Sequence, residues 1–208
     1  MPDTVRIYGS AGNIRETPPC PVGTEVWLAN NPTTVMLRRP RSMDEWTRWF
    51  NLHSRAHILG TYPSGYHYYQ TKAAGRPIYL LKAQPDIPTS IAFPYERIQK
   101  AFPAAKRYFT CTVCWLIAFA VVEGFKHIEL WGFELRDTKP GSAFALERPC
   151  FFYWIKQARE RGVEVVYQEA IKTLPFELGD PDTYDGPLYG YDTRPEEGWD
   201  KTLQKFVE

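Results

Sequence analysis

The spacing of apolar residues changes several times along the chain, and each pattern predicts an element of secondary structure. Residues 111–122 (CTVCWLIAFAVV) form the one long apolar run, which is typical of a buried helix that Gly124 would end. Short runs of β-branched, aromatic and aliphatic residues are typical of buried strands. Strands that alternate with helices predict an α/β fold with a mostly parallel central sheet flanked by helices. The strand-like runs occupy residues 4–8, 24–29, 77–81, 128–131 and 163–167.

Three further segments carry helix-like spacing. Residues 146–161 predict an amphipathic helix, and residues 95–102 predict a weaker one. Residues 44–53 (DEWTRWFNLH) begin with Trp46 and Trp49 at helix-like spacing and become strand-like toward their polar end. This mixed pattern predicts a short helical stretch followed by a strand.

Irregular segments separate and follow these elements. Residues 62–69 (YPSGYHYY) show little periodicity, so we expect a loop there that serves as a lid or an acceptor site. Residues 82–94 contain several prolines and predict an extended connection. Proline, glycine, aspartate and tyrosine dominate beyond Thr173, which predicts an irregular tail. We therefore expect one Rossmann-like nucleotide-binding domain, residues 1–170, and a C-terminal extension, residues 171–208, that packs on it.

Length and charge limit the classes of protein to which the chain can belong. With 208 residues it is long enough for one full core and too short for two ordinary domains. The formal net charge of +1 excludes a global field that would draw the protein to nucleic acid or to an anionic membrane. The start of the sequence lacks the layout of a secretory signal, and the apolar run is too short to span a bilayer. We expect a soluble, cytoplasmic protein without membrane contact.

Two of the four cysteines form a C-x-x-C motif inside the apolar run. Cys111 and Cys114 have the spacing of a redox pair or of half a metal site, but no second pair completes a zinc site. Inside an apolar helix, cysteine also serves as a small hydrophobic residue. Both interpretations stay open, and packing is the one we favour.

Small and polar residues follow the first two predicted strands. The first strand runs into Gly9-Ser10-Ala11-Gly12-Asn13, a turn of the kind that brings backbone N–H groups close to a phosphate or nucleotide. A plain turn that ends the strand explains it equally simply. Asn30 follows the second strand, where its amide would hydrogen-bond a base or a ribose, or form a turn.

Basic residues and histidines supply the other candidate chemistry. Arg38 and Arg39 lie in a proline-containing basic cluster that would bind phosphates or form a solvated loop. His53 follows a predicted strand and His57 comes soon after it. The imidazole pKa lies near neutrality, which makes these two histidines the candidates for a catalytic base.

Four short motifs in order resemble a known superfamily. GSAGN, WLANN, FTCT and ELWGFE are similar to motifs of the superfamily that joins bacterial CMP-sialic-acid-dependent sialyltransferases with archaeal hydroxymethylpterin diphosphokinase-like proteins. The W-x-x-W-F-x-L-H segment is also similar to uncharacterised bacteriophage proteins of that kind. The resemblance covers residues 4–168. It departs from the family pattern where the first turn lacks a Gly-Pro-Ser ending, and where Glu134 replaces the usual Asp.

The resemblance implies a nucleotide crevice with a shared set of contacts. The first turn and the Asn after the second strand would hold the nucleotide, and the hydroxyl-rich helix start would meet donor phosphate or sugar. A glycine would let the ligand approach the strand end. The nucleotide-binding residues implied are Gly9, Ser10, Gly12, Asn13, Asn30, Thr110, Thr112, Gly132 and Glu134.

These expectations favour a nucleotide-sugar-dependent glycosyltransferase with a CMP- or UDP-type donor and a glycan or modified base as acceptor. No Asp-x-Asp follows a core strand, since Asp180 and Asp182 lie in the tail and are expected to form a turn, so we expect transfer without a metal ion. Two alternatives stay open: a pyrophosphokinase that uses ATP and Mg²⁺, and a non-enzymatic viral protein that sequesters a nucleotide. A phage protein would act in the host cytoplasm. A homo-oligomer stays open as well.

Overall fold

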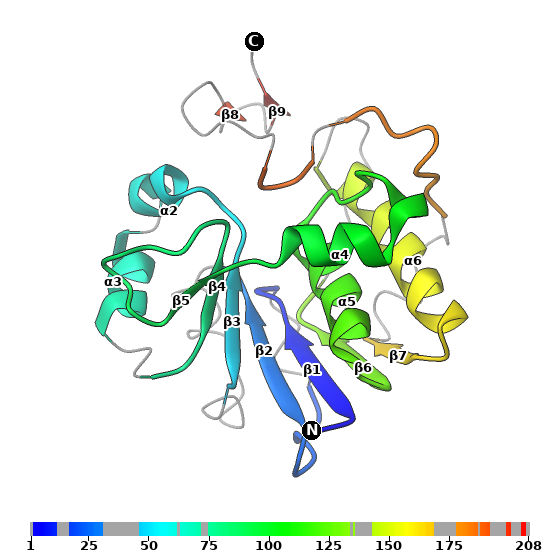
Figure 1. Ribbon diagram of the computed structural model, residues 1–208, viewed down its shortest axis with the longest axis horizontal. Helices are drawn as coiled ribbons and strands as arrows, with labels where there is room; N and C mark the ends of the chain where they lie inside the picture. The colour runs from blue at the N-terminus through cyan, green and yellow to red at the C-terminus, as the bar shows by residue number, and fades with distance from the viewer. Residues whose placement is uncertain are drawn as a thin grey trace.

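The protein is built on one sheet of seven parallel strands in the order β5-β4-β3-β2-β1-β6-β7 (Figure 1). The computed structural model describes residues 2–11, 17–30, 46–61, 63–71, 75–133, 135, 143–168, 178–186, 188–191, 199–200 and 205–206. The strands are β1 (Thr4–Tyr8), β2 (Glu25–Ala29), β3 (Arg48–Asn51), β4 (Ile78–Leu80), β5 (Ser90–Ala92), β6 (His127–Trp131) and β7 (Glu164–Tyr167). The predicted α/β fold with a parallel sheet and flanking helices is confirmed.

The helices follow the pattern that right-handed crossovers impose on such a sheet. From β2 to β5 the chain moves toward one edge, and from β5 to β7 it crosses β1 and moves toward the other. Connections that run in opposite directions place their helices on opposite faces. The helices are α2 (Arg55–Thr61), α3 (Pro63–Thr71), α4 (Tyr95–Ala101), the short 3-10 helix η3 (Pro103–Ala105), α5 (Thr112–Glu123) and α6 (Ala143–Glu160).

Side chains alternate between two cores because successive residues of a strand point to opposite faces. Val5 and Ile7 of β1 lie in the larger core with α4, α5 and α6. Tyr8 of β1 lies in the smaller core with Val26 and Leu28 of β2. This core also includes Ile58 of α2 and Tyr69 of α3. Figure 1 shows α4, α5 and α6 grouped together, apart from α2 and α3.

Helix α5 is the centre of the larger core. Every residue from Thr112 to Ala120 is buried, and the ring of Trp115 stacks on that of Phe109 with centroids 3.5 Å apart. Burying a large apolar side chain in this way stabilises the folded state by roughly 1.5–3 kcal/mol, because its apolar surface is removed from water. Gly124 ends the helix in the left-handed conformation, with φ of 91°, as its position after the apolar run predicts. Burial along its length and the glycine cap at its end thus define helix α5.

Two predictions about the aromatic segments are wrong. Residues 63–69, part of the loop expected over residues 62–69, belong to helix α3 (Pro63–Thr71). Pro63 is tolerated in the first turn of a helix, and Tyr66 and Tyr69 bury their rings on one side. Trp46 and Trp49 do not belong to a helix. Trp49 lies in β3 and Trp46 packs edge-on against it, with ring centroids 5.2 Å apart.

The connection of residues 82–94 contains strand β5 (Ser90–Ala92), which was not predicted because the prolines of this segment favoured an irregular connection. Strand β5 forms the sheet edge, and three residues suffice because Ile78 to Leu80 of β4 supply its partners. Beyond the sheet, β8 (Trp199–Asp200) and β9 (Lys205–Phe206) form a small antiparallel pair.

Parts of the C-terminal tail lie on the domain. The backbone N–H of Gly179 donates to the carbonyl of Pro149, and that of Tyr189 donates to the carbonyl of Phe109. The N–H of Asp182 donates to the carboxylate of Asp180, so the Asp-Pro-Asp segment is a turn, as expected. Among the residues that the structure describes, no helix has the length and apolarity needed to cross a membrane. A C-terminal extension beginning at residue 171 stays a prediction.

Candidate functional site

The carboxyl ends of β1 and β6 meet where the chain reverses its direction across the sheet, which is where open α/β sheets bind ligands. The N–H of Gly9 donates to Trp131 and that of Ala11 to Gly132, each at 2.8 Å, so strand pairing continues past both strands. A Cβ on Gly9 would collide with the carbonyl of Gly132 and would come within 2.7 Å of the Phe133 ring. These two N–H groups are therefore used within the protein, and glycine is required here for close packing.

Gly132 sits in the left-handed region, with φ of 73°, and its N–H donates to Oε1 of Gln168 at 2.7 Å. Gln168 directly follows β7 and is buried. Sequence reasoning missed this residue, although a polar residue after a strand at the same sheet edge is the signal that singled out Asn30. Gln168 fixes the backbone at the end of β6.

Asn30 and Thr112 come together from positions 82 residues apart. The Oγ1 hydroxyl of Thr112 donates to Oδ1 of Asn30 at 3.0 Å. Asn30 is held in the left-handed conformation, with φ of 68°, and its carbonyl accepts from the Trp49 indole at 2.8 Å and the Tyr69 hydroxyl at 3.0 Å. No described residue accepts a hydrogen bond from Nδ2 of Asn30, so this amide remains a donor for a ligand.

The start of α5 lies beside this contact. Cys111 occupies the N-cap and Thr112 the first helical position. The first N–H groups of a helix have no partner within it and carry partial positive charge, so they favour an anion such as a phosphate. Thr110 precedes them and its hydroxyl donates to the carbonyl of Leu146 at 3.4 Å. The predicted residues Asn30, Thr110 and Thr112 thus gather at one place.

His53 is fixed by hydrogen bonds on both sides of its ring. Its N–H and Nδ1 face Oδ1 of Asn51, at 3.2 and 2.8 Å, while the other amide atom of Asn51 donates to the Tyr69 hydroxyl. Because Tyr69 donates onward to the Asn30 carbonyl, the amide of Asn51 has a single consistent orientation. Nδ1 of His53 is then the protonated nitrogen, and Nε2 accepts from the Tyr189 hydroxyl at 3.0 Å.

The surroundings of His53 keep the imidazole neutral. Burial, together with the neighbouring His57, lowers the pKa of His53 to about 4. The two rings stack with centroids 4.8 Å apart and an interplanar angle of 15°. His57 belongs to α2, where its N–H donates to the Ser54 hydroxyl at the helix start. A neutral imidazole with a lone pair on Nε2 is the form that accepts a proton.

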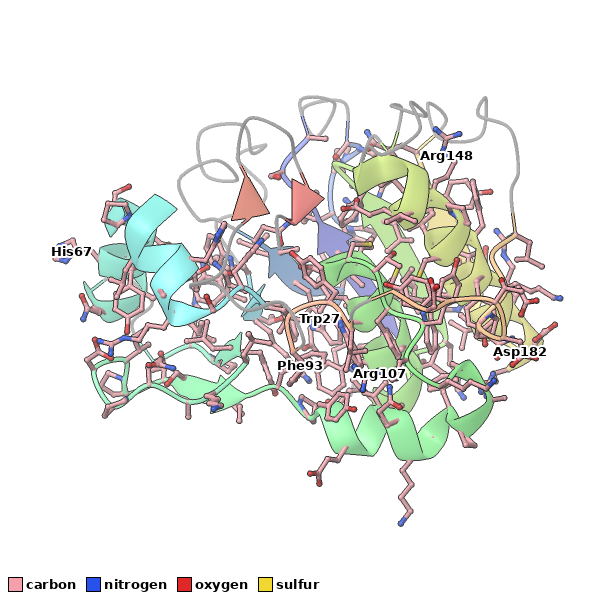
Figure 2. All side chains as sticks on the ribbon, turned by 90° about the horizontal axis from the view of Figure 1, so that it is seen from above. Trp27, His67, Phe93, Arg107, Arg148 and Asp182 are labelled. Carbon is pink, nitrogen blue, oxygen red and sulfur yellow. The ribbon has the colours of Figure 1, made fainter. Side chains whose placement is uncertain are left out.

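A third histidine, His67, belongs to the tyrosine-rich segment and lies away from His53 and His57. Figure 2 shows it at the outer rim of α3, pointing outward, and it is exposed. It provides a matched control for substitutions of His53.

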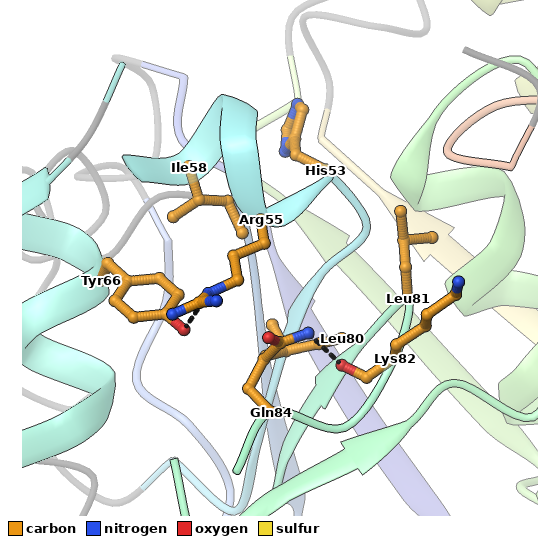
Figure 3. A pocket seen from close by; sticks show the side chains of 8 residues that line it. All are labelled: His53, Arg55, Ile58, Tyr66, Leu80, Leu81, Lys82 and Gln84. Carbon is orange, nitrogen blue, oxygen red and sulfur yellow. Dashed lines mark hydrogen bonds between the residues drawn. The ribbon is translucent and has the colours of Figure 1, made fainter. Parts of the chain in front are cut away.

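A pocket opens next to His53, at the carboxyl ends of β3 and β4 (Figure 3). The pocket is shallow: only about 20 Å³ of it is enclosed enough to compare with a cavity. Apolar side chains form part of the lining and polar ones surround them, among them Arg55, whose Nε donates to the Tyr66 hydroxyl at 2.9 Å. The lining residues are His53, Arg55, Ile58, Tyr66, Leu80, Leu81, Lys82 and Gln84.

Glu147 of α6 is a titratable group that sequence reasoning did not select. Burial raises the pKa of its carboxyl to about 7. It lies close enough to Cys111 that its charge raises the pKa of that thiol. A carboxyl with a strongly raised pKa near strand and helix ends is a common feature of functional sites, although buried structural carboxyls share it.

The predicted site residues fall into three groups. Gly9, Ser10 and Gly132 lie at the β1–β6 ends, Asn30 lies with the threonines at the start of α5, and His53 with His57 follows β3. The hydrogen bonds through Asn51 and Tyr69 connect the last two groups. Gly12, Asn13, Arg38, Arg39 and Glu134 lie outside the described residues.

Sequence reasoning missed three further polar residues of the site. Asn51 lies inside the W-x-x-W-F-x-L-H segment but was not singled out, Tyr69 was assigned to a loop, and Tyr189 lies in the tail with no motif around it.

Comparisons with known proteins give a likeness in fold. No protein-family model matches the sequence, and no curated protein matches it. Two matching structures are of the sialyltransferase CstII from Campylobacter jejuni, in complex with a substrate analogue, cytidine-5'-monophosphate, or with CMP-3FNeuAc. Both share 13% sequence identity with this chain; the first has a TM-score of 0.50 and covers 79% of this chain and 78% of its own, the second 0.52 and 84% of each. The chain thus has the fold of this sialyltransferase.

Proposed function

We propose that the protein is a nucleotide-sugar-dependent glycosyltransferase that uses a CMP- or UDP-type donor without a metal ion. The observation that carries the proposal is one continuous set of hydrogen bonds at the carboxyl edge of the sheet. It runs from Thr112 through Asn30, Tyr69 and Asn51 to His53. It joins groups suited to bind a nucleotide to a neutral imidazole suited to accept a proton. The likeness in fold to a sialyltransferase with CMP-type ligands supports the same proposal.

The donor would lie over the ends of β1, β2 and β6. The free amide hydrogens of Asn30 would bind the base or ribose, and the backbone at Gly132, which has a positive φ, would lie beside the ligand at the end of β6. The phosphate would face the start of α5, whose N–H groups and partial positive charge stabilise the leaving group as negative charge develops on it. Arg38 and Arg39 stay candidates for additional phosphate contacts.

The acceptor would lose its proton to His53. As the glycosidic carbon–oxygen bond to the phosphate breaks, its electron pair goes to the phosphate oxygen, and the acceptor oxygen forms the new bond to the sugar. The acceptor proton moves to Nε2 of His53, while Nδ1–H stays bonded to Asn51. His57, stacked on His53, is the second candidate for the base.

The Tyr189 hydroxyl marks where the acceptor hydroxyl would bind. It donates to Nε2 of His53, the atom to which the acceptor must donate. The adjoining shallow pocket, which is open to solvent, would contact part of the acceptor, a glycan or a modified base. Tyr189 would have to release His53 before transfer.

The test is release of the nucleotide from CMP-sialic acid and from UDP sugars, measured with EDTA and with Mg²⁺. We expect turnover in EDTA that falls about 10²–10⁴-fold in His53→Gln, the range for loss of a general base, and is unchanged in the exposed control His67→Gln. Turnover that is equal in wild type and His53→Gln, with ligand binding retained, would contradict the role of His53.

The same assay separates the alternatives. Strict dependence on Mg²⁺ and ATP would replace the proposal with a pyrophosphokinase, and nucleotide binding without any turnover would replace it with a sequestering protein. A bacteriophage origin and action in the host cytoplasm belong to the proposal through the resemblance in the W-x-x-W-F-x-L-H segment.

A further inference from the structure

The C-x-x-C motif at the start of α5 has no part in the proposed transfer. Cys111 is the N-cap of the helix, in an extended conformation with φ of −158° and ψ of 167°, and Cys114 lies in the first turn. Their Sγ atoms are 3.3 Å apart. Both thiols are buried: Cys111 is 6% exposed and Cys114 is fully enclosed.

The helix start explains why the two thiols face each other. A side chain at the N-cap points toward the residue three positions later, the geometry by which Ser, Thr or Asp caps a helix. Cysteine is a weak acceptor, and Cys111 makes no side-chain capping bond. The position is therefore filled by a poorly capping residue, whose thiol contacts the thiol of Cys114 instead.

We propose that Cys111 and Cys114 form a reversible intrachain disulfide, which makes the start of α5 a redox modification site. A disulfide has an S–S bond of about 2.0 Å, so the two sulfurs need to approach by roughly 1 Å. Because the residues are three apart on one helical turn, rotation about the side-chain bonds brings the sulfurs together without moving another element.

The oxidant is a low-molecular-weight disulfide such as oxidised glutathione. Cys111, the more exposed of the pair, loses its proton to water and attacks a sulfur of the oxidant, which releases one glutathione thiolate and leaves a mixed disulfide. The Cys114 thiolate then attacks the Cys111 sulfur and releases the second glutathione. Both cysteines are oxidised and one disulfide oxidant is reduced, and the two protons that the cysteine thiols lose are balanced by those of the two glutathione thiols formed.

Burial controls how fast the pair reacts. A hydrogen bond from Cys114 favours the Cys111 thiolate, but burial together with the nearby Glu147 and Cys150 outweighs it, so the pKa of Cys111 is raised; burial also raises the pKa of Cys114. Only the thiolate attacks a disulfide. Oxidation is therefore slow near neutrality and accelerates with pH, by up to roughly tenfold per pH unit while the thiol remains mostly protonated.

The two other cysteines serve as comparisons. The Cys150 thiol, on α6, is directed at the Tyr108 carbonyl at 3.4 Å, and it also lies beside Cys114 and helps to raise the pKa of that thiol, so it is the competing partner for Cys114. Cys20 packs against the smaller core, which the opposite face of the sheet forms. All four cysteines are thiols in the structure. The 3.3 Å approach of the two Sγ atoms and their place on one helical turn favour the 111–114 pair over a bond between Cys114 and Cys150.

The disulfide would act on the candidate site through Thr112, which lies between the two cysteines and holds Asn30. A bond that ties the N-cap to the first turn changes the position of that hydroxyl. Any ligand held by Asn30 would then bind differently to the oxidised and reduced protein.

The test uses the full chain, reduced and then treated with excess oxidised glutathione at about pH 7 and about pH 8.5. Free thiols are alkylated in denaturant with iodoacetamide, and peptides are mapped by mass spectrometry. We expect Cys111 and Cys114 to become protected as one internal disulfide, faster at the higher pH and reversibly with dithiothreitol, while Cys150 is alkylated. Cys20, the most exposed thiol, is expected to be alkylated or to carry glutathione as a mixed disulfide, and it takes no part in an internal disulfide.

Variants make the outcome decisive. Cys150→Ser should still form the internal disulfide, whereas Cys111→Ser and Cys114→Ser should not. Wild-type protein in which Cys111 and Cys114 remain alkylatable at the higher pH would overturn the proposal, as would an internal disulfide that uses Cys150 or Cys20. If a serine variant fails to fold by circular dichroism, the peptide map of the wild type decides alone.

Discussion

His53 and Glu147 should make the stability of the protein respond to pH in opposite directions over the same range. Burial and His57 lower the pKa of His53 from 6.5 to about 4, and burial raises that of Glu147 from 4.5 to about 7. Between these values the unfolded chain carries a proton on His53 that the native state lacks, so this group makes stability rise with pH. Glu147 is protonated in the native state and ionised in the unfolded chain, so it makes stability fall with pH.

The magnitude follows from the size of the shifts. Each unit of pKa shift corresponds to about 1.4 kcal/mol. Each group therefore changes the free energy of unfolding by about 3 kcal/mol as the pH moves from below its lower pKa to above its higher one. Between about pH 4.5 and 6.5 the two slopes nearly cancel in the wild type. Replacing either residue should expose the slope of the other, at up to about 1.4 kcal/mol per pH unit.

The assay is guanidinium unfolding of wild type, His53→Gln and Glu147→Gln at about pH 5, 6 and 7.5. The free energy of unfolding of His53→Gln minus that of wild type should be about 2 kcal/mol larger at pH 5 than at pH 7.5. For Glu147→Gln the same difference should increase toward pH 7.5. His67→Gln, exposed on α3, is the control and should track the wild type. A difference between wild type and His53→Gln that does not change with pH would refute a neutral, buried imidazole.

Two further substitutions test the strand ends and the start of α5. Gly9→Ala should lose about 1–3 kcal/mol in guanidinium unfolding because the added methyl collides with β6, whereas Gly60→Ala, in α2 with open space around it, should gain about 0.5–1 kcal/mol. Thr112→Val removes the donor to Asn30 and should weaken nucleotide binding about two- to tenfold by isothermal titration. Thr183→Val, which removes a hydroxyl bonded within an exposed turn, should leave binding unchanged.

The elements that sequence could predict are those whose pattern is local. Alternating or uniformly apolar runs placed β1, β2, β6 and α5 within a residue of their observed bounds, because burial of one or both faces is encoded in the spacing itself. Helix α3 was not predicted, because tyrosine has both an apolar ring and a polar hydroxyl and so does not mark an apolar or a polar face in the sequence. The rings of Tyr66 and Tyr69 are buried even though their hydroxyls form hydrogen bonds.

The site was predictable only as a set of separate strand ends. Asn30 and Thr112 each follow from a local signal, but their hydrogen bond depends on sheet order, which brings β2 beside the start of α5. The contact between His53 and Tyr189 joins residues 136 positions apart, and Tyr189 lies in a segment without periodicity. No local pattern encodes such a pairing, so only the folded chain reveals it.

The central claim is that the carboxyl edge around Asn30 and the start of α5 binds a nucleotide. Thermal unfolding with saturating CMP, UMP, AMP or GMP tests it most directly. A ligand at about a hundred times its Kd stabilises the native state by about 2.7 kcal/mol, which for a chain of this size raises Tm by roughly 5–10 °C. We predict such a rise with at least one pyrimidine nucleotide, and its reduction in Thr112→Val. An unchanged Tm with every nucleotide and nucleotide sugar would contradict the account.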